Sequence, residues 1–160
     1  MSNQSISTLS FVFDNQTDHL LMMQITQDGP LKRKHTGIKA SVDLMESMNQ
    51  AAIRSIQASS GLVVPEVLLR GVIKTIQSES QSSEIYFIYE ASRFSGELAG
   101  HPSGRFKWVD ILNIFNLPME SLVQNLMPYL LDGESFFEGT IHLNAQDEVE
   151  QADIHICNTI

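Results

Sequence analysis

Short runs of apolar residues separated by polar turns dominate the chain, a pattern typical of β-strands. Residues 9–13 and 20–24 flank a polar turn and predict a β-hairpin. Residues 63–76 and 85–89 predict a second antiparallel hairpin across the polar segment 78–83. Three further strands are predicted at residues 106–109, 136–143 and 149–156, the last two as a closing hairpin.

Two segments have helical periodicity instead. In the first, apolar residues recur at spacings of three and four, and Gly61 stands where a helix C-terminus belongs. Asp43 is predicted as the N-cap, with Glu46 three residues later in the capping-box position. Leu122, Leu126, Tyr129 and Leu130 predict a second helix, ended by Asp132 and Gly133. The stripe of the first helix, predicted to face the core, consists of Met45, Met48, Ala52 and Ile56.

The order of these elements predicts the fold class. Strands, a helix, more strands, a second helix and a final hairpin give an α/β fold of the α+β kind, with a mixed β-sheet sandwiched between helices. The length of 160 residues fits one domain spanning residues 1–160. The polar, basic stretch 28–40 before the first helix is predicted to be a loop.

Composition narrows the class of protein. Apolar residues make up 42% and charged residues 18% of the chain, as in ordinary globular proteins. The chain has no run of 18 or more apolar residues, and residues 1–10 do not resemble a secretory signal. Cys157 is the single cysteine, which excludes an internal disulfide and leaves too few thiols for a zinc site. We therefore expect a cytoplasmic protein that does not enter a membrane.

Charge is distributed unevenly. The formal net charge is −9, and all ten Lys and Arg residues precede Trp108, after which nine acidic residues follow without a cation. Such a segment repels a phosphate backbone, so nucleic-acid binding is not expected. Four cations within eight residues could instead meet a small phosphate ligand, although a solvated loop would carry the same charges. These cations are Lys32, Arg33, Lys34 and Lys39.

Residues 37–62 carry the most specific motif of the chain. This segment, GIKASVDLMESMNQAAIRSIQASSGL, resembles without gaps the Nudix box GX5EX7REUXEEXGU, where U is an aliphatic residue. Segments resembling the later elements of MutT-like Nudix members follow at residues 95–109, 115–131 and 136–143. The chain thus looks most like the branch of the Nudix superfamily that contains 8-oxo-dGTP diphosphatases. The box positions that it keeps are Glu46, Arg54, Ile56, Gly61 and Leu62.

The resemblance implies a Nudix fold and, in working members, Mg²⁺ held by box carboxylates against a pyrophosphate. In this chain the box is degenerate, because Ala40 replaces its first glycine and Ser55, Ala58 and Ser59 replace three of its four glutamates. The last three positions share one helix face. Magnesium prefers charged oxygen ligands, so a serine hydroxyl is a poor substitute and an alanine offers nothing. Glu46 is the one inherited candidate ligand for catalysis or for a metal.

Other candidate residues come from the same resemblance. Arg54 helps to organise the acids of the box in the family, and here it could pair with Glu46 or bind a ligand. Glu120 lies roughly where MutT-like relatives place side chains that recognise a base. The predicted ligand-binding set is therefore Lys32, Arg33, Lys34, Lys39, Arg54 and Glu120.

The sequence leaves several functions open. The first is a pseudoenzyme, a Nudix domain without standard Mg²⁺-dependent hydrolysis that binds a nucleoside phosphate or serves as an interaction module. The alternative is an active nucleoside di- or triphosphate diphosphohydrolase, in which Glu46 and acids elsewhere in the cleft replace the standard metal ligands. A homodimer is a further expectation, with Phe136 and Phe137 in the acidic C-terminal third supplying the surface.

Overall fold

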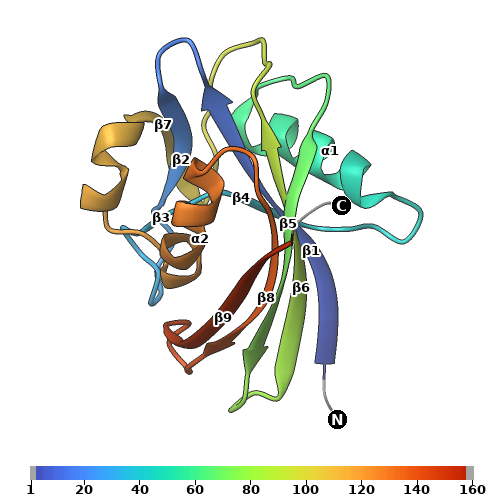
Figure 1. Ribbon diagram of the computed structural model, residues 1–160. Coiled ribbons are helices and arrows are strands. Elements are labelled where there is room, and N and C mark those ends of the chain that lie inside the picture. Colours follow the sequence, from blue (N-terminus) through green and yellow to red (C-terminus); the bar gives the residue numbers. More distant parts are fainter. Residues whose placement is uncertain (1–2, 158–160) are drawn as a thin grey trace.

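The computed structural model describes residues 3–157, which form one mixed β-sheet with helices on both of its faces (Figure 1). The strands are β1 (Asn3–Asp14), β2 (His19–Ile25), β3 (His35–Thr36), β4 (Ile38–Ser41), β5 (Leu68–Gln77), β6 (Ser82–Ala91), β7 (Gly104–Asp110), β8 (Phe136–Leu143) and β9 (Val149–Cys157). The helices are α1 (Met48–Ser60), the 3-10 helix η1 (Ile111–Asn116) and α2 (Ser121–Leu131).

The sheet runs in the order β3-β2-β1-β6-β5-β8-β9, with β4 paired to β1 and β7 paired to β2. The pairs β1–β6 and β5–β8 are parallel, and the other pairs are antiparallel. The three predicted hairpins, β1–β2, β5–β6 and β8–β9, are confirmed. The predicted α+β class with a mixed sheet is confirmed as well.

Two apolar clusters hold the helices against opposite faces of the sheet. The larger cluster lies under α2 and includes Phe11, Ile73 and Leu126. The smaller lies under α1 and includes Val12 and Ile56. Phe11 and Val12 reach different clusters because successive strand side chains point to opposite faces. Figure 1 shows α1 on one side of the sheet and α2 with η1 on the other, which is the predicted sandwich.

Helix α1 begins later than the sequence predicted. Its N-cap is Ser47, whose hydroxyl accepts a hydrogen bond from the Gln50 amide, while the Gln50 side chain accepts one from the Ser47 amide. The prediction of Asp43 as N-cap is therefore wrong. Glu46 does accept a hydrogen bond from the Asp43 amide, but within a separate turn that precedes the helix. Gly61 ends the helix in the left-handed conformation with φ of 84°, as predicted.

The predicted core stripe of α1 is only half right. Met45 lies before the helix and is 92% exposed, and Met48 is also exposed. The buried face is made mostly of small side chains, which let the helix approach β1 and β4 closely. Its members are Ala51, Ala52, Ser55, Ile56 and Ser60.

Two further predictions need correction. Residues 35–40 were expected in a loop, but most of them belong to β3 and β4 because β2 and β1 offer them backbone partners. Phe137 was expected at a dimer surface, but it is fully buried with its ring 5.5 Å from that of Tyr129. Within residues 3–157, no helix combines the length and the apolar character needed to cross a membrane.

Candidate functional site

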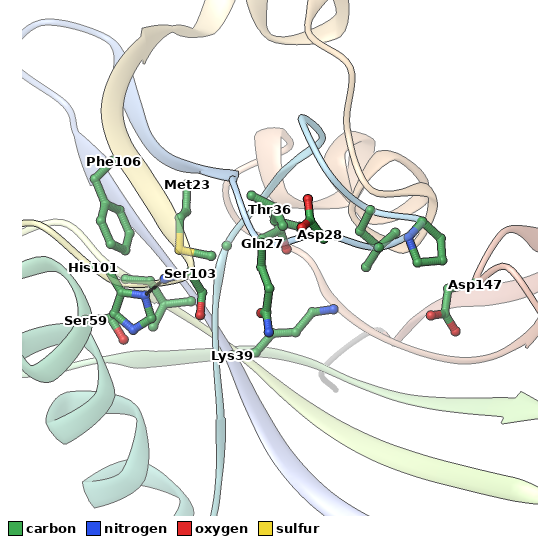
Figure 2. A pocket seen from close by; sticks show the side chains of 16 residues that line it. Met23, Gln27, Asp28, Thr36, Lys39, Ser59, His101, Ser103, Phe106 and Asp147 are labelled. Carbon is green, nitrogen blue, oxygen red and sulfur yellow. Dashed lines mark hydrogen bonds between the residues drawn. The ribbon is translucent and has the colours of Figure 1, made fainter.

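A cleft of about 410 Å³ opens beside β2, β4 and β7 and under the loop that follows β2. Figure 2 shows His101 and Ser59 at one end of this cleft and Asp147 at the other, with Lys39 between them. Most of the lining is apolar, as is typical of pockets for small organic ligands. The larger apolar side chains in it are Met23, Ile25, Leu31, Ile38 and Phe106.

Lys39 and Glu120, two of the predicted ligand-binding residues, meet beside the cleft. The Lys39 Nζ lies 2.5 Å from Glu120 Oε2, and the Thr36 hydroxyl donates to Glu120 Oε1 at 3.0 Å. The Glu120 side chain is only 3% exposed, whereas that of Lys39 is 32% exposed. Lys39 also lies 5.8 Å from the ring centre of Tyr86. Both oxygens of Glu120 are thus occupied, while Lys39 keeps contact with the cleft and with solvent.

The other three predicted cations of this region do not line the cleft. Lys32 forms an exposed ion pair with Asp28 at 2.8 Å on the loop above it. Arg33 adopts a positive φ of 74°, and its backbone amide donates to the carbonyl of Ile25. Lys34 donates through its backbone to Leu31. The basic cluster of the sequence is therefore divided, and Lys39 alone among its members faces the cleft.

Glu46 and Arg54 form a second ion pair, away from this cleft. The Arg54 Nε lies 2.6 Å from Glu46 Oε2, and its second nitrogen donates to Glu46 Oε1 at 3.0 Å and to the Ser41 carbonyl at 3.1 Å. This hydrogen bonding by Arg54 holds the pKa of Glu46 below its ordinary value. Both residues border a separate, open hollow of about 490 Å³.

The degenerate box positions offer no ligand set for magnesium. Ser55 is buried, and its hydroxyl donates to the Ala52 carbonyl at 3.0 Å within the helix. Ala58 has no donor atom, and Ser59 contributes only a neutral hydroxyl to the cleft. Both oxygens of Glu46 are held by Arg54. Among residues 3–157, no three or more His, Cys, Asp or Glu side chains are placed to hold a metal ion. These residues do not fit the magnesium that the resemblance in the sequence implies.

Sequence reasoning missed several polar residues of the cleft. His101 accepts a hydrogen bond from the Ser103 amide through Nδ1, so its other ring nitrogen is left for the cleft or solvent. Asp147 reaches the cleft from the β8–β9 turn, where Gln77 donates to it at 3.1 Å, and burial raises its pKa. Neither residue belongs to a motif, and both come from loops whose positions are set by distant strands.

Solved structures share the fold over most of the chain. The mutator MutT protein from Bacillus halodurans superposes with a TM-score of 0.83 at 21% identity, over 94% of this chain and 97% of that one. A MutT Nudix hydrolase from Burkholderia pseudomallei gives 0.68 at 15% identity, over 81% and 99%. The Nudix domain of Shewanella oneidensis NrtR, in complex with ADP ribose, gives 0.66 at 14% identity, over 82% and 88%.

The protein thus has a Nudix fold of the MutT-like kind, which confirms the resemblance found in its sequence. Among curated proteins it is similar to the uncharacterised Nudix hydrolase YvcI of Bacillus subtilis (strain 168), with 23% identity over 108 residues, or 65% of this chain and 68% of YvcI. No protein-family model matches the chain.

Proposed function

We propose that this chain is a Nudix-fold domain that binds a nucleoside phosphate in the 410 Å³ cleft without catalysing magnesium-dependent hydrolysis. The chemistry of the box positions carries this proposal. Positions 55, 58 and 59 hold no carboxylate, and the remaining acid, Glu46, gives both of its oxygens to Arg54. Because activity belongs to a site and not to a fold, the MutT-like architecture does not restore what these substitutions remove.

The lining of the cleft supports the proposal that a nucleoside phosphate binds there. Its walls of Met23, Ile38 and Phe106 suit the flat, apolar faces of a nucleobase, and Lys39 supplies a positive charge for a phosphate group. The Shewanella NrtR domain, which has the same fold, is complexed with ADP ribose. We therefore propose a ligand of this general class, encountered in the cytoplasm.

Calorimetric titration followed by a phosphate assay tests both the nucleotide binding and the lack of hydrolysis. Dissolved protein is titrated with ADP ribose and separately with dGTP, each in the presence of Mg²⁺, of Mn²⁺ or of a chelator, and released phosphate is then assayed. We expect nucleotide binding that persists in the chelator and no release of phosphate or pyrophosphate. Metal-dependent release would overturn the proposal in favour of the active hydrolase with non-standard ligands.

Two sets of variants sharpen this test. Lys39→Met should weaken nucleotide binding, whereas Lys74→Met, which removes an exposed lysine outside the cleft, should leave it unchanged. The double variant Ala58→Glu with Ser59→Glu returns two carboxylates to the box and should increase Mn²⁺ binding. If the wild type proves to be an active hydrolase, Glu46→Gln should abolish its turnover, since Glu46 is the one inherited candidate ligand.

A further inference from the structure

The charges around the large cleft limit the kind of phosphate ligand that it can hold. Within residues 3–157, the charged side chains that line it are Asp28, Lys39 and Asp147. Asp28 is paired with Lys32 and Lys39 with Glu120, so neither pair adds net charge. Asp147 forms no ion pair with a described residue. The cleft thus offers a phosphate group one cation, and that cation already has an anionic partner.

The polar side chains of the cleft are separated by the sign of their charge. Figure 2 shows His101, Ser59 and Ser103 together at one end and Asp147 at the other, with Lys39 between them. A phosphate group beside Asp147 would meet a like charge in a partly desolvated space, which is unfavourable. The phosphate end of a ligand is therefore expected beside His101.

The end of the cleft beside His101 presents neutral hydrogen-bond donors. The Nδ1 atom of His101 accepts from the Ser103 amide at 3.1 Å, so the proton of the neutral ring lies on Nε2. The edge-on contact with the Phe106 ring, with the two ring centres 6.5 Å apart, helps to orient the imidazole. The hydroxyls of Ser59 and Ser103 line the same cleft and can donate as well. Together they offer three donors to one anionic group.

The backbone holds these donors in place. The Ala99 amide donates to the Ser60 carbonyl at 2.7 Å, which ties the loop before His101 to the end of α1. The Thr26 amide donates to the Ser103 carbonyl at 3.0 Å, which ties the same loop to the end of β2. Donors that are fixed before a ligand arrives lose little conformational freedom when it binds.

We propose that the cleft prefers nucleoside monophosphates, bound without a metal ion, with the phosphate on His101, Ser59 and Ser103. This assignment rests on the proposed function, since it requires a nucleotide in the cleft. One phosphate group matches the three donors. Each further phosphate adds negative charge, whereas Lys39 is already shared with Glu120. Magnesium usually neutralises such groups, but in residues 3–157 no three His, Cys, Asp or Glu side chains gather to hold it.

Calorimetric titration in a chelator tests the preference with adenosine, AMP, ADP and ATP, and in parallel with deoxyguanosine, dGMP, dGDP and dGTP. Hydrogen bonds to a charged phosphate should make the monophosphate bind about tenfold or more tightly than the nucleoside. The triphosphate should bind about tenfold more weakly than the monophosphate, because its added charge is uncompensated. Affinity that rises from monophosphate to triphosphate would overturn this preference but leave nucleotide binding intact. If neither series nor ADP ribose binds, the proposed function fails with it.

Variants test the role of His101 in the same titrations. His101→Phe removes the Nε2 donor and should weaken monophosphate binding about tenfold, while nucleoside binding stays unchanged. His101→Gln keeps an N–H donor and should lose less. His155→Phe is the matched control, because this histidine is exposed and lies outside the cleft.

Ser59→Ala is a second, milder variant and should weaken monophosphate binding several-fold. Thermal unfolding of each variant identifies any that fails to fold, in which case the other carries the test. Equal losses for the nucleoside and the monophosphate would show that His101 only supports the shape of the cleft. Unchanged monophosphate affinity in the folded variants His101→Phe and Ser59→Ala would overturn the assignment of the phosphate to this end.

Discussion

Charged side chains are more exposed to solvent on one side of the sheet than on the other. Beside α1, Glu46 and Arg54 are eight residues apart and form an ion pair near the surface, with the arginine side chain 44% exposed and the glutamate side chain 14% exposed. On the α2 side, Lys39 reaches Glu120 across 81 residues of sequence, and the glutamate is buried. Arg70 is also buried there, only 2% exposed.

This difference has a physical cause. A charge in water can be replaced with little effect on folding. A buried charge satisfies other buried groups, and removing it leaves them unpaired. Arg70, for example, donates to Glu90 and to the carbonyls of Tyr129, Leu130 and Ser135. The comparison predicts that variants on the α2 side have the larger effects on stability.

The largest effect is expected for Arg70→Ala. This change leaves Glu90 and the carbonyls at the end of α2 without their donor, which typically costs about 3–5 kcal/mol for a buried pair. The measurement is the free energy of unfolding from urea titration. Arg93→Ala is the control, because Arg93 and its partner Glu66 are both exposed and such pairs contribute about 0–1 kcal/mol. Equal losses in the two variants would contradict the comparison.

A smaller loss is expected for Glu120→Gln. The amide keeps an acceptor for Thr36 but leaves Lys39 without its carboxylate, at a cost of about 1–3 kcal/mol. Lys39 keeps some contact with water, so the lower part of this range is expected. A double-mutant cycle with Lys39→Met isolates the pair. Additive losses would show that the two side chains do not depend on one another.

The pH dependence of stability should reflect His35. This side chain is buried, and the loss of hydration lowers its pKa, although its Nδ1 donates to the Pro118 carbonyl. Since the unfolded histidine, with a pKa of about 6.5, takes up a proton more readily, stability is complete above that pH and falls below it, by at most about 1.4 kcal/mol per pH unit. His35→Asn should make this slope shallower when unfolding is measured between pH 7 and pH 5. An identical slope in both proteins would assign the effect to other groups.

The smallest effect on stability is expected for Glu46→Gln. The pair with Arg54 is at the surface, so urea unfolding of this variant should closely match that of the wild type. What should change is the acid transition, because the low pKa of Glu46 adds stability that is lost as pH falls through that lowered pKa. A marked loss at neutral pH would show that this pair supports the fold as the buried one does.

Local patterns in the sequence predicted the elements whose stability is itself local. The three hairpins, the end of α1 at Gly61 and the extent of α2 follow from alternation, helical spacing and turn residues close along the chain. The start of β1 and the strands β3 and β4 were missed, because their residues are polar or basic and become strands only by pairing with distant partners.

Some contacts of the candidate site could likewise be predicted from the sequence, and others could not. The sequence by itself determined that the box lacks three glutamates and that Glu46 and Arg54 could pair, since these residues lie on one short segment. Only the tertiary structure decided that Lys39 leaves the basic cluster to meet Glu120, and that His101 and Ser59 share one end of the cleft. The shared end of the cleft depends on the hydrogen bonds that tie the loop before β7 to β2 and to the end of α1. The contact of Lys39 with Glu120 depends on the pairing of β4 with β1 and on the hydrogen bond from the Glu120 amide to the His35 carbonyl. No local periodicity encodes such a pairing, because its free energy comes from burying two faces of the completed sheet.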